Sequence, residues 1–171
     1  SHDKVIYLGT FSKSLAPAIR ISYMVLPVSL MHQYEERGRN FSVTVSRVDQ
    51  KILEMFFREG HFERHLNRMR GVYRTKHDCL ISEMKKLHHI CRIRGEHAGV
   101  HILVEMKNGM TEQEAVEAAR KAGIKVYGLT EYCIRPLKER DTATVLMGYA
   151  TLSEEQMKEA VQLLAEVWGR F

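Results

Sequence analysis

The stretch Gly9-Thr10-Phe11-Ser12-Lys13-Ser14-Leu15-Ala16-Pro17-Ala18-Ile19-Arg20 lies between two short apolar segments. Residues 5–9 and 21–26 have the composition of short buried strands, and the proline at position 27 stops the second one. The connection between them is rich in hydroxyl groups and carries two cations, Lys13 and Arg20. We therefore expect a loop that places a lysine and an arginine at the end of a small sheet.

These residue types suit one kind of ligand. A lysine amine is a nucleophile for carbonyl compounds, and the planar fork of Arg20 matches a phosphate. Thr10 and Ser12 add hydroxyl groups that can donate to the same phosphate. Pyridoxal phosphate is a phosphorylated carbonyl compound and meets this description. On spacing alone, such a segment is more typical of an ordinary solvated loop, which remains the alternative.

The same stretch resembles the lysine segment of fold-type I pyridoxal-phosphate enzymes. More narrowly, it is similar to the MocR (GabR-like) branch of GntR-type transcription regulators, which join an N-terminal winged helix-turn-helix to an aminotransferase-like domain. Residues 60–73, 98–101 and 147–150 also resemble that branch, in the same order along the chain. The resemblance implies an α/β fold, with residues 1–58 as the last part of the large cofactor domain and residues 59–171 as the small C-terminal domain.

The resemblance also implies roles for individual residues. Lys13 would form the internal aldimine with pyridoxal phosphate, and Arg20 would pair with the cofactor phosphate. Thr10 and Ser12 would hydrogen-bond near that phosphate, with Thr10 the better match. Further cofactor contacts and the DNA-binding module precede the lysine segment in the family, so we expect this chain to be a C-terminal fragment.

For the function, the resemblance implies an effector-sensing domain of a transcription regulator. A small amino compound would bind by replacing the internal aldimine with an external one. The alternatives are a catalytic aminotransferase and a structural dimerisation module without cofactor. We expect a homodimer in the full-length protein, and DNA binding only through the N-terminal winged-helix domain.

Two further residues concern the choice of effector. Aminotransferases bind the substrate carboxylate with an arginine on the strand before the last helix, where this chain has Leu146. In the GABA-responsive regulators a carboxylate-binding arginine lies in the segment that matches residues 127–132, where this chain has Glu131. We therefore expect an effector other than a GABA-like ω-amino acid, unless Arg135 takes that role.

The composition excludes several classes of protein. No stretch approaches 18 uncharged apolar residues, so we expect no membrane span. No secretory leader is visible, and a cytoplasmic location is expected. The net charge is +5, and residues 58–86 hold 8 basic against 4 acidic residues. This excess is more typical of the solvated face of a long helix than of a nucleic-acid-binding stripe.

No metal site is expected from the cysteines and histidines. Cys79, Cys91 and Cys133 are widely spaced and form no CxxC pair, so neither zinc nor a disulfide framework is predicted. His61 and His65 share a predicted helix face without a matching carboxylate motif.

The remaining chain predicts helices over residues 29–37, 44–59 and 61–90, followed by a small α/β layer. Capping boxes at Thr111 and Ser153 predict that two later helices begin there. The expected strands in this layer are residues 100–106, 124–127 and 145–149, with a charged loop at residues 132–142.

Overall fold

The structure is a computed structural model that describes residues 4–42, 44–97, 99–135 and 143–170. The chain divides into two compact units, Ser1–Arg70 and Gly71–Phe171, and the division falls within helix α4 (His61–Met84). The domain boundary expected after residue 58 refers to the complete protein and stays a prediction.

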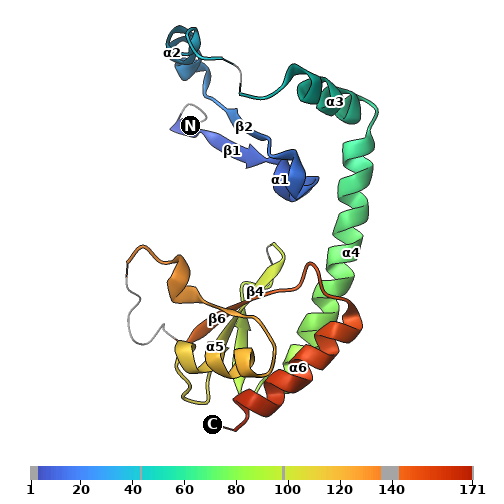
Figure 1. Cartoon of the computed structure of the whole chain (residues 1–171), viewed down its shortest axis with the longest axis vertical. Helices are drawn as coiled ribbons and strands as arrows, with labels where there is room; N and C mark the ends of the chain where they lie inside the picture. Colours follow the sequence, from blue (N-terminus) through green and yellow to red (C-terminus); the bar gives the residue numbers. More distant parts are fainter. Residues whose placement is uncertain (1–3, 43, 98, 136–142, 171) are drawn as a thin grey trace. The chain divides into compact units, whose positions relative to one another are not determined.

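The first unit begins with an antiparallel pair of strands, β1 (Tyr7–Thr10) and β2 (Ser22–Val25), which are the two strands expected from the sequence (Figure 1). The expectation of an irregular loop between them is wrong. The connection forms a short helix, α1 (Phe11–Ser14), and a 3-10 turn, η2 (Pro17–Ile19). The proline at the first position of η2 favours this turn, because its fixed φ suits a helical start.

Three helices follow in the order that the sequence predicts: α2 (Val28–Gly38), α3 (Arg47–Arg58) and the first half of α4. Helix α3 is capped by Ser46, whose hydroxyl accepts a hydrogen bond from the Val48 N–H at 3.2 Å. Such a cap satisfies one of the free N–H groups of the first helical turn.

The first unit buries few apolar side chains. Among its described residues, Ile21 and Leu53 are the buried hydrophobic ones. Both strands instead expose large side chains, with Leu8 73% and Val25 56% exposed. A two-stranded sheet is only marginally stable by itself. The stability of this unit therefore depends on further protein surface that covers its exposed apolar side chains.

The second unit contains a four-stranded antiparallel sheet in the order β3-β4-β6-β5. Three of its strands, β4 (His101–Met106), β5 (Tyr127–Gly128) and β6 (Thr144–Gly148), lie at or close to the predicted positions.

The fourth strand, β3 (Cys91–Arg94), was not expected. The long predicted helix ends earlier than residue 90, at Met84, and continues as a 3-10 turn, η3 (Lys85–Leu87). Ile90 and Cys91 are buried against the sheet, and this tertiary packing overrides the helical spacing of residues 61–90.

Helices α5 (Glu112–Lys121) and α6 (Glu154–Trp168) begin at the predicted capping boxes, which are confirmed. The Thr111 hydroxyl accepts from the Glu114 N–H at 3.3 Å, and the Glu114 carboxylate accepts from the Thr111 N–H at 2.8 Å. That backbone N–H holds the pKa of Glu114 below its ordinary value. Ser153 and Gln156 repeat this reciprocal pair at the start of α6.

The core of the second unit lies between one face of the sheet and the helices α4, α5 and α6. Trp168 is completely buried there, and its indole Nε1 donates to the Ala115 carbonyl at 3.0 Å. The Asn108 side chain in turn donates to the Trp168 carbonyl at 2.7 Å. The end of α6 is therefore fixed to α5 and to the turn after β4. None of the helices described is long and apolar enough to cross a membrane.

We expect Trp168→Phe to lower the free energy of unfolding by about 1–3 kcal/mol, because it removes one buried hydrogen bond and leaves a cavity. Urea unfolding followed by circular dichroism measures this loss. Gln162→Ala, at an exposed position of the same helix, is the control and should change stability by less than about 0.5 kcal/mol. Equal stability of the two variants would contradict the role given to Trp168.

Candidate functional site

The helix that carries Lys13 is tied across the end of the β1–β2 pair. Thr10 caps α1: its hydroxyl accepts from the Ser12 N–H at 3.2 Å and donates to the Ile21 carbonyl at 3.2 Å. The Phe11 N–H donates to the same carbonyl at 2.9 Å. These bonds fix the first turn of α1 and leave the Lys13 side chain exposed.

Arg20 lies in the same connection, at the return to β2. The strand pairing ends at Thr10 and Ser22, so Lys13 and Arg20 both lie beyond the same end of the ladder. Arg20 is exposed and has φ +49° and ψ +31°, the left-handed conformation, and is the only described residue other than glycine with positive φ. That conformation costs an ordinary residue roughly 1–2 kcal/mol, so the surrounding turn imposes it.

An aromatic cluster, made of Phe11, Tyr23, Phe57 and Phe62, holds α1 in place. The Phe11 ring centroid lies 5.0 Å from that of Tyr23, 5.4 Å from that of Phe57 and 6.2 Å from that of Phe62. The rings of Phe57 and Phe62, at the end of α3 and the start of α4, are 4.5 Å apart. The His65 Nε2 also donates to the Ser14 carbonyl at 3.1 Å, so both ends of α1 have a tertiary contact.

The Tyr23 ring lies over the backbone of the facing strand. Gly9 is its direct partner in the ladder, and a Cβ at Gly9 would collide with the end of the ring. A hydrogen bond with Tyr7, together with burial, raises the pKa of the Tyr23 phenol. The glycine therefore allows the close approach that brings Tyr23 against Phe11.

The two predicted hydroxyl groups differ in what they can still bind. Thr10 has a single O–H donor, which already points to the Ile21 carbonyl. The Ser12 hydroxyl makes no hydrogen bond to any described residue of the chain. The connection thus offers one amine, one guanidinium and one unengaged hydroxyl, and this donor set fits a phosphorylated aldehyde such as pyridoxal phosphate.

The predicted effector residues lie in the second unit. Glu131 belongs to a 3-10 turn, η4 (Leu129–Tyr132), and is exposed, as is Arg135. Glu131 lines a cavity of about 440 Å³ together with two cations, Arg120 and Lys125. Only the start of the predicted charged loop, residues 132–135, lies in the described part of the chain.

Sequence reasoning missed a contact that fixes this turn. Glu112, the first residue of α5, accepts hydrogen bonds from the N–H and the hydroxyl of Thr130. The two residues are 18 positions apart in the sequence, and neither the capping box nor the segment 127–132 predicts that they pair.

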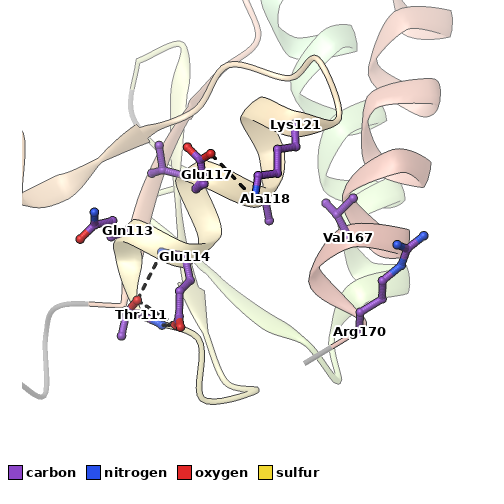
Figure 2. A pocket seen from close by; sticks show the side chains of 9 residues that line it. Thr111, Gln113, Glu114, Glu117, Ala118, Lys121, Val167 and Arg170 are labelled. Atoms are coloured by element: carbon purple, nitrogen blue, oxygen red, sulfur yellow. Dashed lines mark hydrogen bonds and ion pairs between the residues drawn. The ribbon is translucent and has the colours of Figure 1, made fainter.

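A second unpredicted feature is a groove of about 720 Å³ between α5 and the end of α6 (Figure 2). Its lining combines apolar side chains, such as Val116 and Val167, with the charged Lys121 and Arg170. Within the described ranges, no three His, Cys, Asp or Glu side chains come close enough to hold a metal ion.

The chain matches a known protein family along most of its length. The aminotransferase class I and II family matches residues 1–164. The chain therefore belongs to that family.

Among individual proteins, the uncharacterized HTH-type transcriptional regulator YdeL of Bacillus subtilis is 38% identical over 98% of this chain and 36% of its own length. The probable rhizopine catabolism regulatory protein MocR of Rhizobium meliloti is 26% identical over 94% of this chain and 32% of its own length. The chain thus spans about a third of these relatives.

Solved aminotransferases share the fold. The multiple substrate aminotransferase of Thermococcus profundus superposes with a TM-score of 0.84 at 22% identity, over 99% of this chain and 42% of that protein. The α-aminoadipate aminotransferase LysN of Thermus thermophilus, complexed with N-(5'-phosphopyridoxyl)-L-leucine, gives a TM-score of 0.80 at 22% identity, over 97% of this chain and 42% of that protein. The α/β architecture is therefore that of a part of the aminotransferase fold.

The conformation of Arg20 can be separated from its charge. Arg20→Ala and Arg20→Gly both remove the guanidinium, but only glycine adopts positive φ without strain. We expect Arg20→Gly to be about 1 kcal/mol more stable than Arg20→Ala in urea unfolding. Equal stability of the two variants would show that the chain relaxes away from the left-handed conformation.

Proposed function

We propose that this chain is the C-terminal part of a pyridoxal-phosphate-binding, effector-sensing domain in a MocR-type transcription regulator. DNA binding belongs to a separate winged-helix domain of the same protein, which acts in the cytoplasm as a homodimer. The observation that carries the proposal is the similarity to helix-turn-helix regulators along 98% of the chain.

In this proposal Lys13 is the covalent attachment point of the cofactor. Its exposed side chain on α1 leaves the amine accessible to an aldehyde, and the aromatic cluster keeps α1 from shifting when the amine is engaged. Arg20, at the same end of the strand pair, binds the phosphate as a bidentate donor. Pyridoxal phosphate, when bound, supplies the carbonyl carbon at which an amino compound is recognised.

The hydroxyl groups have distinct parts in the proposed site. Ser12 donates to the phosphate, because its proton is not engaged with any described residue. Thr10 shapes the turn through its bonds to Ser12 and Ile21. Thr10 can donate to the phosphate only when its hydroxyl no longer donates to the Ile21 carbonyl.

A catalytic aminotransferase is the second candidate, favoured by the 22% identity to the aromatic-amino-acid aminotransferase 1 of Thermococcus litoralis over 95% of this chain. The regulators YdeL and YhdI are 38% and 37% identical over a similar length, which favours regulation. Turnover of an amino acid with 2-oxoglutarate by the full-length protein would establish the enzyme instead.

We expect Lys13→Ala to abolish the borohydride-trappable cofactor adduct of the full-length protein completely, since the variant lacks the amine that attaches the cofactor. Absorption spectra and mass spectrometry after reduction measure the adduct. Lys51→Ala is the matched control, because Lys51 is an exposed lysine paired with Glu54 at 2.7 Å in α3. An adduct retained in Lys13→Ala would place the attachment elsewhere.

The effector in this proposal is an amine that lacks a GABA-like distal carboxylate. In its exposed position, Glu131 would repel such a carboxylate through its like charge. A second amine on the ligand would instead find an acceptor in Glu131. Arg135, four residues further on, is the competing partner for a carboxylate.

Spectral titration of the full-length protein tests this choice. We expect 1,4-diaminobutane to change the cofactor absorption at a concentration at least about tenfold lower than GABA, the factor given by one charge-assisted hydrogen bond. Glu131→Ala should remove this preference, and Arg135→Ala should leave it. A response to micromolar GABA that Arg135→Ala abolishes and Glu131→Ala preserves would refute the role of Glu131.

A further inference from the structure

Glu112 connects the first turn of α5 to the segment that carries Glu131. One carboxylate oxygen accepts from the Thr130 N–H at 3.2 Å, and the other accepts from the Thr130 hydroxyl. Both bonds end on a single residue, directly before Glu131 in η4. The carboxylate therefore fixes the backbone and the side chain of Thr130 together, as a two-point clamp.

The neighbouring backbone is shaped to admit this carboxylate. A Cβ placed on Gly128 would collide with the carboxylate end of the Glu112 side chain, because it would lie 2.8 Å from the Glu112 Cδ. Gly128 pairs with Val145 of β6 and is buried, so the strand cannot easily move away. The glycine at this position thus leaves the space through which Glu112 reaches Thr130.

The helix end that holds Glu112 is itself fixed. The capping box of Thr111 and Glu114 closes the first turn of α5, as Figure 2 shows beside the groove. Ala115 and Ala119 of the same helix are fully buried. Because the start of α5 is rigid, the Glu112 carboxylate has a defined position. The η4 segment, by contrast, has only the backbone hydrogen bonds of one short 3-10 turn.

We infer that Glu112 is a positioning residue for effector binding: it holds the η4 turn, and with it Glu131, in the conformation that receives the effector. This inference rests on the proposed function of the segment. Glu112 acts through Thr130 and does not itself touch the ligand. Its negative charge is therefore replaceable, but its acceptor for the Thr130 N–H is not.

The test uses full-length protein loaded with pyridoxal phosphate and titrated with 1,4-diaminobutane, GABA and L-alanine. We expect Glu112→Ala to weaken binding of the responding amine about tenfold, the effect of losing one charge-assisted hydrogen bond, with cofactor affinity unchanged. Glu112→Gln keeps an acceptor for the Thr130 N–H and should stay within about threefold of wild type. Glu155→Ala removes an exposed carboxylate from the first turn of α6 and is the control.

Hydrogen–deuterium exchange of the peptide that covers residues 127–132 gives a readout that needs no ligand. We expect faster exchange in Glu112→Ala, with Glu112→Gln and Glu155→Ala close to wild type. Unchanged exchange in Glu112→Ala would overturn the clamp. Unchanged amine affinity in Glu112→Ala would overturn its role in effector binding, as would an equal loss in Glu112→Gln, which would indicate that the charge acts on the ligand directly.

The sensing function and the positioning role of Glu112 can be contradicted separately. A wild-type protein whose cofactor absorption responds to none of the three amines contradicts the proposed sensing function, and the exchange comparison still decides whether Glu112 holds the turn. A responsive wild type with an equally responsive Glu112→Ala variant leaves the sensing function intact and contradicts only the positioning role.

Discussion

The packing of Phe11 against Phe57 and Phe62 is the interaction on which the lysine segment depends. Helix α1 has four residues, too few to be stable through its own hydrogen bonds. Its orientation therefore comes from tertiary contacts, chiefly the ring of the residue two positions before Lys13. The same rings join the end of α3 to the start of α4, so one aromatic cluster holds both the helix junction and the short helix that carries Lys13.

The second unit is organised by different means. Its buried apolar side chains form one continuous core beneath the sheet, and two capping boxes define where its covering helices begin. Turns that depart from regular structure are held by individual polar bonds, such as those from Glu112 to Thr130. Helices and strands thus carry the fold, while single polar side chains hold the turns between them.

Features with a local cause were predictable from the sequence. The capping boxes at Thr111 and Ser153 need only residues three apart, and the prediction of both was confirmed. Strand β3 was missed because its four residues follow a long helical pattern, and its pairing with β4 is decided by tertiary contacts. The helix α1 was missed for the same reason, because a hydroxyl-rich segment becomes helical only through its cap and its aromatic contacts.

In the candidate site, too, features with a local cause could be predicted from the sequence, and features decided by tertiary contacts could not. Lys13 and Arg20 were singled out by residue type within one short segment. The engagement of Thr10 with Ile21 and the left-handed backbone at Arg20 follow from the closure of the turn in three dimensions. The pairing of Glu112 with Thr130 joins different elements of the second unit, and no local pattern could reveal it.

The exposed apolar faces of β1 and β2 have a consequence for biogenesis. A two-stranded pair with large uncovered side chains such as Leu8 and Val25 does not hold its geometry until other surface covers it. The turn that bears Lys13 is closed by this pair, so the position of the Lys13 side chain also depends on that cover. In the proposed function, attachment of the cofactor at Lys13 therefore follows the covering of these strands during folding.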